Sequence, residues 1–168
     1  MNEVNKPAAR EVLDHLRDRR EDLVGLLRRM TEAESPSDRP EAQQEIREII
    51  AAEFERLGYR VRKIPGRTSG GMLHARPATR RTGQGAQLIL GHYDTVWPVG
   101  TLAEMPFERS GDTVSGPGVY DMKGGVAQAL LAIGALEHFG LEPELMPHVF
   151  LNSDEEIGSR ESRRYIES

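Results

Sequence analysis

The sequence predicts an α/β fold in which a mostly parallel sheet carries helices on both faces. Segments with helical periodicity alternate with short apolar runs of the kind that form strands. One strand–helix–strand succession, over residues 85–152, has the order of a right-handed crossover between parallel strands. The length of 168 residues suits a single domain with a core of its own.

Two helices are expected before the first strand. Apolar residues at helical spacing predict a helix over residues 10–30. The segment SPSDRPE interrupts it, and Asp38 with Glu41 has the spacing of a capping box that would start a second helix. That helix ends before Gly58 and buries one apolar face, made of Ile46, Ile49, Ile50, Phe54 and Leu57.

Strands and one long helix follow. Strands are predicted near residues 59–64 and 72–76, and the continuous apolar run GAQLILGH at 85–92 is typical of a buried parallel strand. Residues 122–139 have the pattern of a helix that ends before Gly140. HVFLN at 148–152 is predicted to be another buried strand.

Composition excludes several classes of function. The net charge of -5 and the lack of a basic stripe argue against a nucleic-acid partner. Without cysteine, the chain has no thiolate metal ligand, disulfide or cysteine nucleophile. Neither a signal peptide nor an apolar segment long enough for a membrane span is visible, so we expect a cytoplasmic protein with no membrane partner.

Acidic and imidazole side chains follow the predicted strands at one edge of the sheet. His92 and Asp94 come at the end of one strand, and Glu155 and Glu156 follow the end of another. Asp121 begins the helix between those strands. Ligands of open α/β sheets bind beyond the carboxyl ends of the strands, so these side chains together indicate a site.

The first two clusters each allow a structural and a functional interpretation. Alternate residues of a strand point the same way, so Asp94 can hold one ring nitrogen of His92 and leave the other for a metal. For such a pair taken alone, the simpler interpretation is a histidine that is hydrogen-bonded to a neighbouring acid with no metal. Asp121 could cap the helix, or it could bridge two cations. A dinucleotide-binding fingerprint is excluded, because it needs glycine at the position that Asp121 occupies.

The adjacent acids Glu155 and Glu156 need a reason to lie side by side, because like charges repel. A solvated acidic loop is the simple explanation. In a metal site, one glutamate can coordinate a cation while its neighbour takes a proton from the attacking water.

The three clusters together carry a family resemblance. GHYDTV at 91–96, GPGVYDMKGG at 116–125 and NSDEEIGS at 152–159 resemble, in this order and spacing, the motifs of the M20 metallopeptidases. That family includes glutamate carboxypeptidases, aminoacylases, acetylornithine deacetylase and succinyl-diaminopimelate desuccinylase. The resemblance covers residues 10–168, and DTVWPVGTLAEMPF at 94–107 is most similar to the glutamate carboxypeptidase branch.

This resemblance implies a zinc-exopeptidase-like catalytic domain with two divalent metal ions, either zinc or else cobalt or manganese. It implies that His92 binds one metal, that Asp121 bridges both and that Glu156 binds the other. It also implies that Glu155 is the general base, that Asp94 orients His92 and that the peptide bond after Asp121 is cis. The implied activity is cleavage of an amide bond in a small substrate, a peptide C-terminal residue or an N-acyl amino acid, by a metal-activated water.

Members of the family are longer than this chain, and they take two further ligands, an acid and a histidine, from later segments. The small domain that carries dimer contacts and substrate-binding groups in relatives has no counterpart here. We therefore expect residues 1–168 to be the N-terminal portion of a catalytic domain, inactive alone and homodimeric in full-length form. The alternative is a non-catalytic metal-binding or interaction module. A phosphate site at the helix after Asp121 is disfavoured, because an acid would face the phosphate.

The four other histidines are expected to be surface or structural residues, with the assignment of His74 left open. They are His15, His74, His138 and His148. Trp97 and Phe107 are expected to pack rather than to contact substrate.

Overall fold

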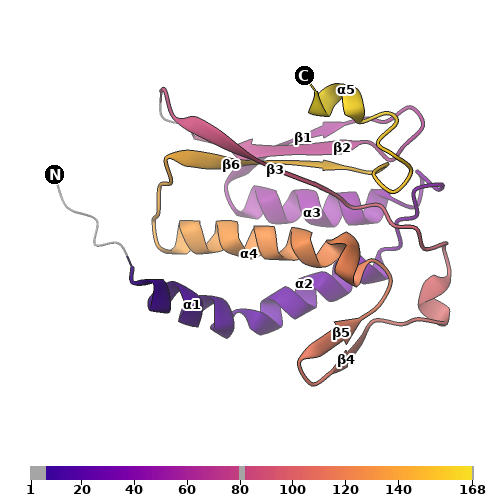
Figure 1. Ribbon diagram of the computed structural model, residues 1–168, viewed down its shortest axis with the longest axis horizontal. Helices are drawn as coiled ribbons and strands as arrows, with labels where there is room; N and C mark the ends of the chain where they lie inside the picture. The colour runs from indigo at the N-terminus through magenta and orange to yellow at the C-terminus, as the bar shows by residue number, and fades with distance from the viewer. Residues whose placement is uncertain (1–6, 80–81, 168) are drawn as a thin grey trace.

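A four-stranded sheet with the order β1-β2-β6-β3 forms the centre of the computed structural model, which describes residues 7–79 and 82–167 (Figure 1). Its strands are β1 (Tyr59–Ile64), β2 (Met72–Pro77), β3 (Gly85–His92) and β6 (Leu145–Asn152). A separate hairpin pairs β4 (Glu108–Ser110) with β5 (Thr113–Ser115). The helices are α1 (Ala9–Asp18), α2 (Arg20–Glu32), α3 (Gln44–Arg56), α4 (Gly124–His138) and α5 (Arg163–Ile166).

The α/β class is confirmed, but the sheet is mixed rather than mostly parallel. β3 and β6 run parallel and are joined through α4, as predicted for the crossover. β2 is antiparallel to both β1 and β6. A short turn joins β1 to β2, and strands joined so closely can pair only in the antiparallel sense, which the strand pattern alone did not show.

Helices cover the two faces of the sheet unequally. α1 to α4 lie on one side, and the short α5 lies on the other (Figure 1). The main core fills the space between the sheet and helices α2, α3 and α4, and its central side chains include Met30, Ile50, Phe54, Leu73, Val126, Leu130, Val149 and Leu151. A smaller apolar cluster on the other face joins Ile64, Met72 and Phe150 to α5.

β3 corrects the prediction of a buried strand at 85–92. It is an edge strand of the sheet among the described residues, and Leu88 and Leu90 are 56% and 47% exposed. Only its last residues, Gly91 and His92, are buried. An unbroken apolar run indicates that both faces of a strand could be covered, but it does not say what covers them.

The N-terminal helices also differ from the prediction. The single helix expected over residues 10–30 is broken at Arg19, in a charged stretch (residues 17–22) that has no apolar side chain to anchor a continuous helix. The expected capping box does not form, since α3 begins at Gln44 and Asp38 is exposed. In the segment before α3, Ser37 and Gln43 instead donate hydrogen bonds to the loops at the carboxyl edge of the sheet. No helix in the described part of the chain is long and apolar enough to cross a membrane.

Candidate metal centre

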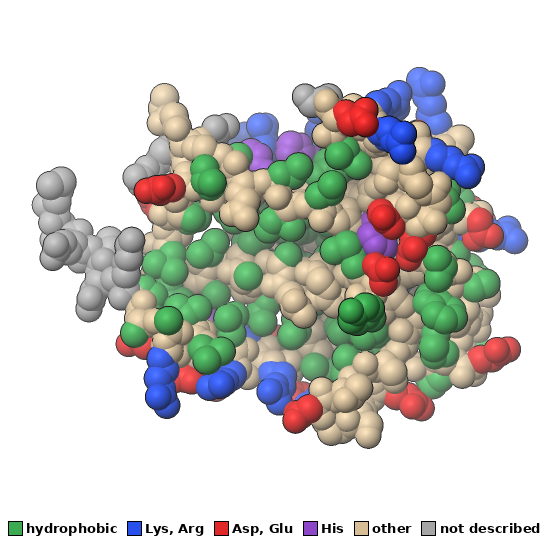
Figure 2. Space-filling view, in the orientation of Figure 1, with side chains coloured by type: hydrophobic (Ala, Val, Ile, Leu, Met, Phe, Trp, Pro, Cys, Tyr) green, Lys and Arg blue, Asp and Glu red, His purple; other side chains and the backbone are tan. Residues whose placement is uncertain are grey.

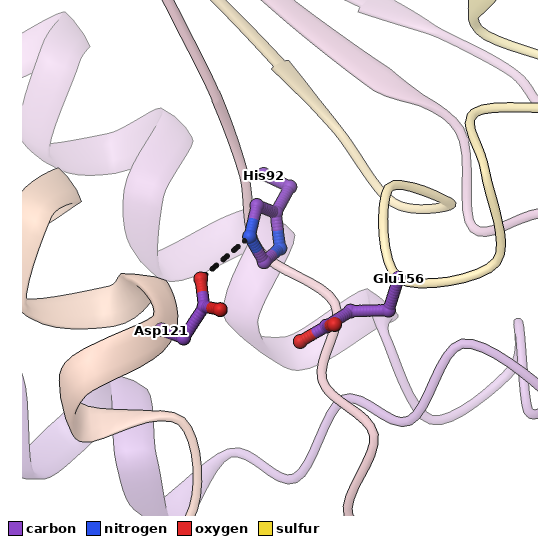
Figure 3. A group of neighbouring side chains, drawn as sticks. All are labelled: His92, Asp121 and Glu156. Atoms are coloured by element: carbon purple, nitrogen blue, oxygen red, sulfur yellow. Dashed lines mark hydrogen bonds and ion pairs between the residues drawn. The ribbon is translucent and has the colours of Figure 1, made fainter.

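Three segments that are distant in sequence meet at the carboxyl edge of β3 and β6. His92 is the last residue of β3, Asp121 lies in the turn Val119–Lys123 before α4, and Glu156 follows β6. One potential ligand atom from each lies within 4.8 Å of the other two. The three side chains point toward one another (Figure 3), and acidic side chains gather around a histidine on this face of the molecule (Figure 2).

The ring of His92 is held in one orientation. The residue is 4% exposed, and its Nδ1 lies 3.0 Å from the carbonyl oxygen of Asp94 and 3.3 Å from the Asp94 carboxylate. Nδ1 donating to this residue leaves Nε2 as the free ligand atom, which faces Asp121 Oδ1 at 3.1 Å. A hydrogen bond of this kind to the far nitrogen fixes the tautomer of a metal-binding histidine.

The buried carboxylate of Asp94 contacts several parts of the site. Its side chain is 0% exposed. Ser37 Oγ donates to Asp94 Oδ2 at 2.7 Å, and the backbone N–H groups of Glu155 and Glu156 donate to the same carboxylate at 3.3 and 3.2 Å. One buried carboxylate therefore positions both the imidazole and the loop that carries the two glutamates.

Met122, the residue after Asp121, packs closely against the end of β3. A Cβ at Gly91 would lie 2.9 Å from the Cε of Met122, so a larger residue there would require the Met122 side chain to shift. The Met122 sulfur also lies 3.3 Å from the backbone nitrogen of His92. The peptide bond between Asp121 and Met122 is cis, as the resemblance implies.

The three consecutive acids after β6 have three different surroundings. Asp154 is buried and accepts hydrogen bonds from the backbone of its own loop, away from the site. The Glu155 side chain is 52% exposed, and its Oε2 lies 3.7 Å from His92 Nε2. Glu156 is half-buried and supplies the third atom of the cluster.

The charged groups of the site shift the pKa values of His92 and Glu156. Burial opposes protonation of His92, but the hydrogen bonds and charge of Asp94, with help from Asp121, outweigh it and raise the pKa of His92 to about 9. Burial and the charges of Asp121, Asp94 and Glu155 raise the pKa of Glu156, and His92 partly offsets them.

These residues fit a divalent metal ion. An imidazole nitrogen and carboxylate oxygens are ligands that zinc, cobalt and manganese accept. The fixed orientation of His92 supplies the outer contact that metal-binding histidines commonly have. A cation would also relieve the repulsion among the converging carboxylates, which the histidine alone offsets only in part.

The other residues singled out in the sequence lie elsewhere. His15 stacks on His138 with ring centroids 4.0 Å apart, and His74 faces His148 at 5.9 Å across β2 and β6. Phe107 is buried and packs under Arg28, as expected for a packing residue. Trp97 does not follow that expectation, since it is 41% exposed in the loop that follows His92.

Sequence patterns did not reveal several side chains that position the site. Gln43 Nε2 donates to the carbonyl groups of Pro36 and Ser153, and so links the segment before α3 to the glutamate loop. Lys123 is 1% exposed, and its Nζ donates to the Ala33 carbonyl at 3.1 Å. Burial lowers the pKa of Lys123 to about 7 against the opposing charge of Glu34. Only Lys123 lies within a recognisable motif, DMKGG.

A groove of about 790 Å³ on the helical side is separate from this centre. It is lined by residues of α1 to α4, and none of the three converging residues contributes to it. Its walls carry both arginine and glutamate side chains, two of which, Arg29 and Glu53, pair across it.

Comparison with known proteins agrees with the geometry. Residues 88–168 match peptidase family M20/M25/M40. Over 121 residues the chain is 34% identical to carboxypeptidase G2 of Pseudomonas sp. (strain RS-16), an alignment that covers 71% of this chain and 29% of that protein. Residues 88–168 therefore belong to the M20 peptidase family. The family predicted from the three motifs is confirmed.

Solved structures of M20 peptidases share the fold. Human carnosine dipeptidase 1 superposes with a TM-score of 0.79 at 20% identity, over 94% of this chain and 37% of that chain. An M20 family metallo-carboxypeptidase from Sulfolobus solfataricus gives a TM-score of 0.61 at 24% identity, over 88% of this chain and 33% of that chain. At these identities the likeness shows the fold alone. The chain spans about a third of the length of each relative.

Proposed function

We propose that this chain carries the metal-binding half of a catalytic centre in a hydrolase that cleaves an amide bond of a small peptide or an N-acyl amino acid. The observation that carries the proposal is the convergence of His92, Asp121 and Glu156 within 4.8 Å, with the carboxylate of Glu155 beside them. Family membership supports the reaction class. The identity to carboxypeptidase G2 favours a substrate that loses its C-terminal residue.

In this proposal His92, Asp121 and Glu156 would hold two divalent ions, with zinc first among the candidates. When bound, such ions acidify a water molecule and polarise the scissile carbonyl. Asp94 keeps the His92 ring in place, and its buried charge stabilises the orientation in which Nε2 faces the site.

We infer that Glu155 is the general base. Its side chain is more exposed than that of Glu156, and its Oε2 lies 3.7 Å from His92 Nε2, beside the proposed metal ligands. We infer that Glu155 takes a proton from the water and later donates it to the departing amine, so that one residue serves as base and then as acid.

The three proposed ligands give each of two ions only two protein ligands, counting the bridge twice, whereas catalytic zinc normally has three. We therefore propose that residues 1–168 form the N-terminal portion of the catalytic domain and that the full-length protein supplies the remaining ligands, the substrate-binding domain and the contacts of a homodimer. Where no further ligands are supplied, the same cluster would be a metal-binding module without catalysis.

A pair of matched variants of the full-length protein tests the assignment. Glu155→Gln should lower the turnover of dipeptides or N-acyl amino acids by about 10²–10⁴-fold, because the amide cannot accept a proton at neutral pH. Its metal content should stay near that of the wild type. Glu156→Gln should lose metal along with turnover, because a neutral amide is a poor ligand for a dication.

Metal analysis and steady-state kinetics on the same preparations separate the two roles. Loss of metal in Glu155→Gln with full occupancy in Glu156→Gln would reverse the assignment. Full activity of both variants would show that the paired glutamates belong to a solvated loop, and would refute the proposal.

A further inference from the structure

The turn between β1 and β2 holds a carboxylate from a distant part of the chain. Glu161 accepts backbone hydrogen bonds from Arg67 N at 2.6 Å, Thr68 N at 3.0 Å and Ser69 N at 3.0 Å. The hydroxyl groups of Thr68 and Ser69 donate to the same carboxylate at 3.2 and 2.9 Å. Successive backbone N–H groups that converge in this way form an anion-binding concavity, here called the cradle (residues 67–69).

The sequence around the cradle forces the backbone into this shape. A Cβ at Gly66 would lie 2.2 Å from the carbonyl oxygen of Ser69, so no other residue can close the turn so tightly. Just beyond the cradle, the Gly70 amide donates to Gln43 Oε1 at 2.8 Å, and Gln43 also holds the Ser153 carbonyl. The cradle is thus fixed to the segment before α3 and, through it, to the glutamate loop.

Glu161 stands at the far end of the segment that carries the catalytic candidates. Residues 155–160, here called the glutamate arch, begin at the two amides that donate to Asp94. They end where Asp154 Oδ2 accepts hydrogen bonds from the backbone of Glu161 at 2.7 Å and of Ser162 at 3.2 Å. Asp94 therefore holds the N-terminal end of the arch, and the cradle holds the C-terminal end through the Glu161 side chain.

The contact persists across the range of pH in which an enzyme works. Partial burial opposes ionisation of Glu161, but the amides of Arg67 and Thr68 and the amide and hydroxyl of Ser69 outweigh it and lower the pKa of Glu161 to about 2. The side chain is consequently an anion at neutral pH and matches a cradle of donors.

We propose that the cradle is an anion-binding site whose ligand is the chain's own Glu161, and that this internal ligand positions Glu155 and Glu156 over the metal centre. The positioning role rests on the function proposed above. The binding of a carboxylate anion by the cradle does not. Glu161 touches neither substrate nor metal in this scheme, so it is a positioning residue.

Three variants of the full-length protein test the positioning role: Glu161→Ala, Glu161→Gln and, as a matched control in the same C-terminal segment, the exposed Glu167→Ala. Glu161→Ala should lower metal affinity or kcat by about 10–100-fold, the range found when outer contacts of metal ligands are removed. Glu161→Gln should recover part of the loss, because its amide oxygen can replace the carboxylate oxygen that accepts four of the five hydrogen bonds. Glu167→Ala should match the wild type.

A second measurement tests the cradle without reference to catalysis. Amide hydrogen exchange in Glu161→Ala should speed up at residues 67–69 and 155–162 and stay unchanged in β3 and β6, which a merely global loss of stability would not produce. Formate titrated into Glu161→Ala should shift the amide resonances of residues 67–69, and the wild type, whose cradle is filled, should not respond.

The outcomes separate the two proposals. A wild-type protein without metal-dependent hydrolysis would defeat the proposed function while the exchange and formate experiments still decide the cradle. Unchanged exchange at residues 67–69 together with no formate response would overturn the cradle. Normal kcat and metal affinity in Glu161→Ala would overturn the positioning role in an active enzyme.

Discussion

The loops that leave the carboxyl ends of β3 and β6 are neighbours in space, but they differ in whether the loop itself supplies the side chains that anchor it. The β3 loop (residues 93–100) is gripped by another segment, since Ser35 Oγ donates to the Tyr93 carbonyl at 2.7 Å and Ser37 Oγ donates to Asp94. The β6 loop (residues 153–162) supplies its own anchoring carboxylates, Asp154 and Glu161. His92, the strand residue just before the first loop, has a buried imidazole held in one orientation, whereas the second loop carries the exposed Glu155 and the half-buried Glu156.

This difference suits the chemistry proposed for each loop. A ligand such as His92 gains from being fixed before the metal arrives, because no ordering is then needed on binding. A general base, the role proposed for Glu155, must reach two positions during one reaction. A loop that is held at both ends and exposed between them suits this role better. Asp94 joins the two loops, because its carboxylate accepts hydrogen bonds from the backbone of Glu155 and Glu156.

The largest effect is expected at Asp94. Asp94→Ala removes the acceptor of the Glu155 and Glu156 amides and the charged acceptor of the buried Ser37 hydroxyl, and should lower the free energy of unfolding by about 3–5 kcal/mol, the range for removing one partner of a buried charged contact. Chemical denaturation of the metal-free protein measures this. The exposed Asp38→Ala is the control and should change stability by less than about 0.5 kcal/mol. Equal stabilities for the two variants would show that Asp94 does not join the loops.

An intermediate effect should separate the two serines that grip the β3 loop. Ser37→Ala removes a hydrogen bond to a charged acceptor and should cost about 2 kcal/mol, whereas Ser35→Ala removes one to a neutral carbonyl and should cost about 1 kcal/mol. Both hydroxyl groups are buried and both substitutions delete the same atom, so each is the control for the other. A larger loss in Ser35→Ala would contradict the charged character assigned to the Ser37 contact.

The smallest effect is expected from the titration of Glu161. The pKa of Glu161 is lowered from 4.5 to about 2 in the folded protein. Its contribution to stability is therefore complete above pH 4.5 and is lost as the pH falls through about 2, because the unfolded chain takes up the proton first. The difference in unfolding free energy between the wild type and Glu161→Ala should shrink over that window, and the carboxyl carbon resonance of Glu161 should titrate near its lower end. A midpoint near 4.5 would show that the cradle does not hold the anion.

The sequence predicted the parts of the molecule that depend on local pattern. The strand after Gly58, the crossover through α4 and the meeting of His92, Asp121 and Glu156 at one edge all follow from periodicity, from the geometry of parallel strands and from three motifs. The class of fold needed nothing beyond these patterns.

The sequence did not predict contacts made between distant segments without a repeating pattern. Ser37 reaches Asp94 across 57 residues, and Glu161 reaches Ser69 across 92. Serine and glutamate occur so often in loops that no spacing distinguishes these from solvated residues. The same limit explains β3, where Leu88 indicated a buried strand, although burial depends on which other segments pack against it.

The long sequence separations at the centre also have a consequence for folding. Asp94 and Glu156 are 62 residues apart and His92 and Asp121 are 29 apart, so their contacts require large loops to close. Each doubling of a loop adds only about 0.6 kcal/mol to the equilibrium cost, but contacts between distant residues form slowly. The helices and the β1–β2 hairpin rest on local contacts and form readily. We expect the centre to assemble only after β3 and β6 have paired around α4, so that metal binding, where it occurs, would follow folding of the sheet.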